Sequence, residues 1–288
     1  MRPLDGYRVV SLAVNVPGPT ACARLAALGA SITKVEPPAG DPLAATHPEW
    51  YEELRAGQDV LMLDLKQAGP RARLDELLDG PDLLLTSSRP GALARLGLAW
   101  PDLHARFPRL CQVAIVGHPE PDQERAGHDL TYAAGVGLVA PPRLPLTLVA
   151  DLGGAERAAA AALALLLSRE RSGEAGYVEV PLADAAAAFA APLRHGATAS
   201  GGLLGGGLPA YGLYEADGGW LAVAALEPHF RQRLAERLGL EELTHDGLAA
   251  AFRARTVDDW EAWAREHDLP LAAVRDRKPP PAQSPEPG

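Results

Sequence analysis

Three titratable side chains have types and surroundings that suit catalysis: His128, Asp151 and Glu227. Carboxylates and imidazoles are the groups that proteins most often use to transfer protons, and a carboxylate is also a nucleophile. Asp151 follows the apolar run 146–150 and precedes a glycine pair and a long Ala/Leu-rich segment. We therefore expect it at a strand-to-helix junction, where the positive end of a helix dipole favours a carboxylate.

Each of the three residues also has an ordinary structural explanation. Asp is a leading helix N-cap type, so Asp151 fits a cap. His128, beside Asp129, fits a structural hydrogen bond, and Glu227, before Pro228, fits an exposed acid at a helix start. Residue types alone leave both interpretations open.

Glycine dominates residues 201–207. A flexible surface loop and a lid that closes over a ligand both use such a segment, and regular structure there would be costly. Neither a GxxxxGK phosphate loop nor a GxGxxG turn after the first strand is present, which disfavours a dinucleotide-binding enzyme.

The elements that position these residues begin as alternating β-rich runs and helical patterns. This alternation predicts a parallel sheet with crossover helices. We expect strands at 7–14, 31–36, 60–65, 82–86 and 110–116, with helices at 20–28, capped by Thr20, and at 70–78. Further along we expect a helix at 155–170, a strand at 177–180, a helix at 183–191, a hairpin at 210–225 that turns at 217–219, and helices through Trp263.

The composition restricts the classes of partner. The 288 residues are 47% hydrophobic and carry a formal net charge of −10, which gives no overall attraction for nucleic acid or an anionic membrane. No apolar run is long enough to span a membrane, and the N-terminus has no signal-peptide pattern. Two cysteines make neither a disulfide framework nor a cysteine metal site. A cytoplasmic protein without a metal or redox cofactor is expected.

Several segments, in order along the chain, resemble the family III CoA-transferases and the α-methylacyl-CoA racemases related to them. Together they extend over roughly residues 4–270, and as an ordered set they are specific. They are LDGYRVVSL (4–12), PGP (17–19), LGASITKVEPP (28–38), LDLK (63–66), RPGALARLG (89–97), RAGHDLTY (125–132), LVADLGG (148–154), LLGGG (203–207) and YEADGGWLAVAALEPHF (214–230).

The resemblance implies a role for each of the three titratable residues. In the racemases, the residues that match Asp151 and His128 are acid/base groups on either side of the thioester α-carbon, and the one that matches Glu227 orients the histidine. In the transferases, the matching aspartate is a nucleophile that forms an anhydride and then an aspartyl-CoA thioester. The Gly-His-Asp and Leu-Glu-Pro patterns favour the racemase branch, with CoA transfer between carboxylic acids as the alternative.

The resemblance also implies that coenzyme A binds as the thioester substrate. Matching positions give the candidate CoA contacts Asn15, Val16, Pro17, Leu63, Lys66, Arg89 and Arg95.

Some features depart from the family pattern. Compared with the family pattern, we expect the chain to be several tens of residues short and to lack the C-terminal segment that helps to interlock two subunits. Residues 57–61 lack the usual cationic pattern, and the acids at 116–124 should repel phosphates. A degenerate, non-catalytic paralogue is therefore a further alternative, although retention of all three titratable residues argues against it.

For the fold, the resemblance implies an α/β protein with a Rossmann-like parallel sheet and a smaller α+β domain. We expect a CoA-binding and catalytic domain at 1–191, the small domain at 192–273 and a disordered Pro-rich tail at 274–288. A homodimer is the implied assembly.

Overall fold

The computed structural model describes residues 1–275 and divides the chain after Ala190 into two compact units, which are described separately here. The sequence placed the boundary after Ala191. Of the expected Pro-rich tail, residues 276–288 lie outside the described part.

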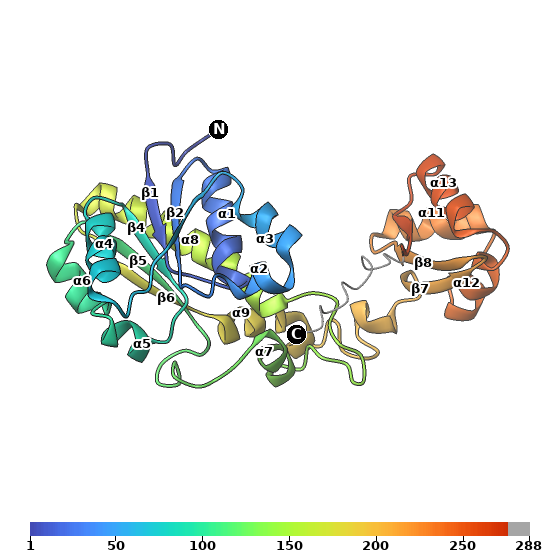
Figure 1. The fold of residues 1–288 in the computed structure, drawn as a ribbon. Coiled ribbons are helices and arrows are strands. Elements are labelled where there is room, and N and C mark those ends of the chain that lie inside the picture. The colour runs from blue at the N-terminus through green and yellow to red at the C-terminus, as the bar shows by residue number, and fades with distance from the viewer. Residues whose placement is uncertain (276–288) are drawn as a thin grey trace, which may run out of the picture. The chain divides into compact units, whose positions relative to one another are not determined.

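The first unit is built on a six-stranded, wholly parallel sheet, which confirms the predicted α/β class (Figure 1). The spatial order β3-β2-β1-β4-β5-β6 reverses direction between β1 and β4. In open sheets of this kind, ligands bind outside the carboxyl ends of the strands at such a reversal. The strands are β1 (Arg8–Ser11), β2 (Ser31–Glu36), β3 (Asp59–Met62), β4 (Leu83–Thr86), β5 (Cys111–Val116) and β6 (Tyr177–Pro181).

Helices cover both faces of this sheet (Figure 1). Strand β4 shows why, because Leu83 and Leu85 pack into the core with α1 and α8, whereas Leu84 packs into the core with α4, α5 and α6. A strand that is buried on both faces reads as a continuous apolar run. The helices are α1 (Pro17–Ala27), α2 (Pro42–Thr46), α3 (Pro48–Arg55), α4 (Ala68–Leu78), α5 (Pro90–Arg95), α6 (Trp100–Arg106), α7 (Asp129–Gly135), α8 (Val149–Ser172) and α9 (Leu182–Phe189).

Two helix starts differ from the sequence-based expectation. Helix α1 begins at Pro17, because a proline lacks only an N–H that a first-turn residue leaves unbonded anyway, so Thr20 is not its cap. Helix α8 begins at Val149, and residues 138–148 before it contain no strand. Asp151 therefore lies within the first turn of α8, and the expected strand-to-helix junction is wrong.

The second unit contains a small antiparallel sheet with the order β7-β8-β9. The predicted hairpin is confirmed, with β7 paired to β8 across Asp217 and Gly218. Leu221, Phe252 and Trp260 belong to its buried core. Its elements are α10 (Ala191–Arg194), β7 (Tyr211–Ala216), β8 (Gly219–Ala224), α11 (Pro228–Leu238), α12 (His245–Phe252), α13 (Val257–Glu266) and β9 (Leu271–Ala273).

The glycine-rich segment folds tightly on itself within this second unit. Leu203–Gly207 forms one wide helical turn that is interrupted by non-helical angles at Gly205 and Gly206. A Cβ atom on Gly205 would lie 1.8 Å from the carbonyl oxygen of Ala199, so glycine is required by the close approach of backbone.

Among the helices of residues 1–275, none combines the length and the apolar character that crossing a membrane requires.

Candidate active site

His128 and Asp151 line one cavity of about 270 Å³ at the carboxyl end of the parallel sheet. The loops after β1, β4 and β5 supply most of its wall, as expected at the reversal of strand order. The structure thus brings together two of the three residues that the sequence selected. The complete lining consists of Val14, Asn15, Pro17, Pro42, Ser87, Arg89, Ile115, Val116, Gly117, Gln123, Arg125, Gly127, His128, Tyr132, Asp151 and Leu182.

A second carboxylate, Asp129, positions Asp151. Asp129 Oδ1 accepts hydrogen bonds from the backbone amides of Ala150, at 2.7 Å, and of Asp151, at 3.0 Å. These are orphan donors of the first turn of α8, whose N-cap residue Leu148 has no capping side chain. Asp129, which belongs to α7, therefore caps the first turn of α8. Asp151 is not the N-cap residue, so the interpretation of Asp151 as a helix cap is wrong.

The surroundings of Asp151 make its proton affinity unusually high. The residue is only 9% exposed. Burial raises the pKa of its carboxyl group, the neighbouring Asp129 raises it further, and His128 opposes the change, so that the pKa is about 6. Near neutral pH the side chain can therefore both accept and release a proton, which is what acid/base catalysis requires.

The glycine pair after Asp151 lets α8 approach α9 closely. A Cβ atom on Gly153 would lie 2.4 Å from Phe189 Cε2, and one on Gly154 would lie 2.2 Å from Leu182 Cδ2. Leu182 lines the cavity that contains Asp151. The glycines therefore help to set where this end of α8 meets the cavity wall.

His128 immediately precedes α7 in an extended conformation. Its backbone N–H donates to the Thr131 hydroxyl at 3.0 Å, and that hydroxyl donates back to the His128 carbonyl at 2.8 Å. The residue is exposed, and its side chain lines the cavity that contains Asp151. Its electrostatic interaction with Asp151 lowers the pKa of that carboxyl group, so the two side chains influence each other in the cavity.

Tyr132 and Arg125 line the same cavity but were not selected from the sequence as site residues. The Tyr132 ring is buried where two glycines leave room, since a Cβ atom on Gly117 or Gly127 would lie 2.5 or 2.6 Å from its hydroxyl oxygen. Burial raises the pKa of the Tyr132 hydroxyl, and the charge of Asp151 raises it further. The Gly-x-x-x-x-Tyr spacing at 127–132 was the available signal, but it is too short a pattern to be specific.

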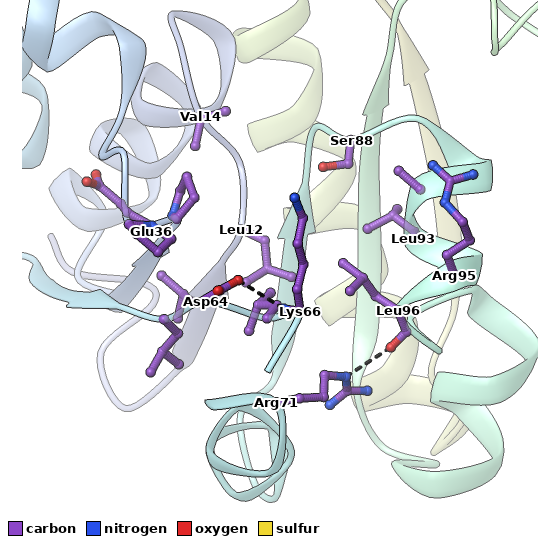
Figure 2. Close-up of a pocket in the computed structure, with 16 residues that line it drawn as sticks. Leu12, Val14, Glu36, Asp64, Lys66, Arg71, Ser88, Leu93, Arg95 and Leu96 are labelled. Carbon is purple, nitrogen blue, oxygen red and sulfur yellow. Dashed lines mark hydrogen bonds between the residues drawn. The ribbon is translucent and has the colours of Figure 1, made fainter. Parts of the chain in front are cut away.

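A larger cavity of about 630 Å³ lies beside the first, and Val14 lines both. Figure 2 shows Lys66 extending into this cavity between Leu12 and Leu93, while Arg95 approaches from α5. Arg71 is turned to the Leu96 carbonyl, to which its Nε donates at 2.9 Å. The volume of this larger cavity lies within the range of ligand pockets, and the residues that line it are mainly apolar with a few cations.

The seven candidate CoA contacts distribute over these two cavities with one exception. Leu63, Lys66 and Arg95 line the larger cavity. The smaller cavity is lined by Asn15, Pro17 and Arg89. The exception is Val16, whose side chain is buried with Leu43 and Tyr51 and lines neither cavity.

One acid of the loop that we expected to repel phosphates occupies a helix end. Glu124 Oε1 accepts a hydrogen bond from the Gly91 amide at 2.6 Å, in the first turn of α5. The carboxylate thus lies where the helix end would otherwise favour a ligand anion.

Glu227 belongs to the second unit, where it is the residue before α11 and its side chain caps nothing. Within residues 1–275, no group of three or more His, Cys, Asp or Glu side chains is arranged to hold a metal ion.

Comparisons with known proteins identify the family. The model of CoA-transferase family III matches residues 4–280. A succinyl-CoA–D-citramalate CoA-transferase of Chloroflexus aurantiacus is 30% identical over 88% of this chain and 69% of its own. The α-methylacyl-CoA racemase of Homo sapiens is 31% identical over 89% of this chain and 69% of its own. The crystal structure of a hypothetical protein of Mycobacterium tuberculosis superposes with a TM-score of 0.84 at 26% identity, covering 96% of this chain and 85% of that one. The chain belongs to CoA-transferase family III, whose members include both transferases and racemases of CoA thioesters.

Proposed function

We propose that this enzyme transfers the α-proton of a 2-methylacyl-CoA thioester, with Asp151 and His128 as its two acid/base groups. The observation that supports this most directly is that both side chains line one small cavity and that the pKa of Asp151 is about 6. A proton α to a thioester is weakly acidic, so its removal needs a base whose proton affinity suits neutral pH.

The proposed reaction needs no group beyond these side chains. The ionised Asp151 removes the proton from one face of the α-carbon, and the electron pair moves onto the thioester oxygen to give an enolate. The protonated His128 then returns a proton to the opposite face, which inverts the centre. In the reverse direction the two residues have the opposite roles. Because each side chain exchanges its own proton with water, the proton that it delivers to the α-carbon comes from the solvent.

Coenzyme A would bind along the two adjoining cavities. Lys66 and Arg95 at the larger cavity are suited to the phosphates of its nucleotide end. Val14 lines both cavities, so a ligand that extends from one to the other passes this residue. The thioester end would then lie in the cavity that contains Asp151.

For Glu227, a residue of the second unit, the family resemblance supports the role of orienting the catalytic histidine. A carboxylate partner holds an imidazole in one tautomer and one orientation. The family resemblance also supports a homodimer, which light scattering would test, and a location in the cytoplasm, which cell fractionation would test.

CoA transfer between carboxylic acids is the second candidate. Here Asp151 attacks the thioester to give an anhydride and free CoA thiolate. The thiolate then attacks the aspartyl carbonyl, which forms an aspartyl-CoA thioester and releases the first acid. The second acid attacks this thioester to give a new anhydride and free thiolate, and attack of the thiolate on the acyl carbonyl of the second acid gives its CoA thioester and frees Asp151. The relatives that are CoA-transferases support this candidate, and it needs Asp151 but not His128.

Incubation with a 2-methylacyl-CoA in deuterated water, followed by mass spectrometry, tests both candidates. Deuterium at the α-carbon that disappears in Asp151→Ala and in His128→Ala, but persists in His104→Ala, establishes proton transfer. His104 is a matched control because it lies on α6, outside both cavities. CoA exchange with an added carboxylic acid, without deuterium uptake, establishes the transferase. Neither signal, together with no CoA binding, indicates the degenerate paralogue.

A further inference from the structure

A fully buried ionic cluster lies at the carboxyl end of β2. Lys34 is 0% exposed, and its Nζ contacts Glu36 Oε1 and, at 2.5 Å, Asp41 Oδ2. The Tyr51 hydroxyl donates to the same oxygen of Glu36, and the Lys34 ammonium lies 4.7 Å from the centre of the Tyr51 ring. Burial alone would raise the pKa of Glu36, but the hydrogen bonds from Lys34 and Tyr51 outweigh it and lower the pKa.

The net stability that such a cluster provides is small. Removing charges from water offsets most of their attraction, and well-packed apolar side chains often stabilise a core as well or better. The cluster therefore requires another explanation, and its second set of contacts supplies one.

Asp41 connects the cluster to the cavity wall. While its Oδ2 contacts Lys34, its Oδ1 accepts hydrogen bonds from the backbone amides of Asn15 and Leu43, both at 2.9 Å. Lys34 thus fixes the orientation of the Asp41 carboxylate, and the oriented carboxylate in turn holds the backbone amide of Asn15.

Asn15 has an uncommon backbone conformation. Its φ angle is 66°, in the left-handed region that few residues other than glycine and asparagine adopt. The preceding residue is held as well, because the Val14 amide donates to Ser87 Oγ at 3.0 Å. Hydrogen bonds from two different loops therefore define the path of Val14 and Asn15.

These two residues occupy the border between the cavities. Val14 lines both cavities, and Asn15 lines the one that contains Asp151. Any shift in their backbone would change how a ligand that extends from the larger cavity presents its reacting end.

We propose that the buried Lys34–Asp41 ion pair is a positioning pair that holds the Val14–Asn15 backbone, and through it places the acyl end of a CoA thioester against Asp151. Neither residue lines a cavity or touches the reacting atoms. The proposal rests on the proposed use of these cavities by an acyl-CoA.

The test compares Asp41→Ala with Asp82→Ala. Asp82 makes the same two kinds of interaction at the opposite end of the sheet. Its Oδ1 contacts the buried Arg169 at 2.7 Å, and its Oδ2 accepts a hydrogen bond from one backbone amide, that of Arg8, at 2.7 Å. Asp82 lines neither cavity. This matched control separates loss of a buried ion pair from loss of positioning.

For Asp41→Ala we expect kcat for α-proton exchange to fall at least tenfold, while the dissociation constant of free CoA changes less than threefold. Asp82→Ala should keep kcat within twofold of the unmodified protein. If Asp41→Ala does not fold, Asp41→Asn keeps the side-chain volume and should show a smaller loss in the same direction. An unchanged kcat in a folded Asp41 variant, or an equal loss in Asp82→Ala, would overturn the proposal.

Hydrogen–deuterium exchange gives a measurement that does not depend on activity. We expect the peptide that contains the Asn15 amide to lose protection in Asp41→Ala and to keep it in Asp82→Ala. If no thioester reacts with the unmodified protein, the proposed function fails, and this measurement still decides the positioning role. Equal protection of the Asn15 peptide in both variants would refute it.

Discussion

The side chain of Asp129 hydrogen-bonds the backbone amide of Asp151 at 3.0 Å, so that one carboxylate holds the helix turn that carries the other. The same proximity raises the pKa of Asp151, because two negative charges oppose each other. Asp129 therefore affects both the position and the proton affinity of the candidate catalytic acid. The two effects can be separated, because an asparagine keeps the accepting oxygen and removes the charge.

We predict that Asp129→Asn shifts the acid limb of the pH–rate profile to lower pH. If Asp151 must be ionised to accept a proton, the rate of the unmodified enzyme falls as pH decreases through about 6. Loss of the Asp129 charge lowers the pKa of Asp151, and we expect the limb to move by about one pH unit. Measurement of kcat/KM between pH 4.5 and 8 checks this, and an unmoved limb would contradict it.

Asp151→Asn should abolish the proposed activity and stabilise the fold at alkaline pH. The pKa of Asp151 is about 6 in the folded protein and near 3.8 without its surroundings, so the folded state favours the protonated form. The free energy of unfolding therefore decreases as pH rises from below 4 through 6, by about 3 kcal/mol in total.

An asparagine at this position does not ionise. Urea denaturation at pH 8 should show the variant to be more stable by up to about 3 kcal/mol. Near pH 3 the two proteins should be about equally stable. A variant that is less stable at pH 8 would show that the Asp151 carboxylate is not under electrostatic strain.

Gly18→Ala should destabilise the first unit. A Cβ atom on Gly18 would lie 2.4 Å from Ala13 Cβ and 2.8 Å from the Ala13 carbonyl carbon, which belong to the segment that leads to the cavity border. Backbone must move to admit it, at about 1–3 kcal/mol. Gly135→Ala is the matched control, because its Cβ would meet nothing within 4 Å and helix propensity favours alanine. Thermal unfolding of both variants measures the difference, and equal melting temperatures would refute the prediction.

Arg95→Ala should weaken CoA binding about tenfold, since a hydrogen bond to a charged group contributes about 1.5 kcal/mol or more. The loss should shrink as salt is raised, because salt screens exposed charges. Arg73→Ala is the control, because Arg73 pairs with Glu76 on α4 and lines neither cavity. Calorimetric titration with CoA at low and high ionic strength measures this. Equal affinities of the two variants would place the CoA phosphates elsewhere.

Much of the fold was predictable because its signals are local. Strands β4 and β5 are buried along their whole length and are mainly apolar, as is typical of strands covered on both faces. The hairpin turns at Asp217 and Gly218, as its residue types predict. The start of α8 was misplaced for the opposite reason. Its first turn is capped by Asp129, a residue 22 positions away from Asp151, and no local pattern reveals a cap supplied from a distance.

The sequence by itself determined the alternation of strands and helices, the family, and the selection of His128 and Asp151, because these depend on residue types and on their order along the chain. Only the tertiary structure decided which side chains share a cavity, that Val16 is buried outside both cavities, and that Lys34 is completely buried between two carboxylates. The proton affinity of Asp151 is also a property that only the tertiary structure decided. The pKa of Asp151 depends on burial and on a neighbouring charge, which are properties of three-dimensional proximity.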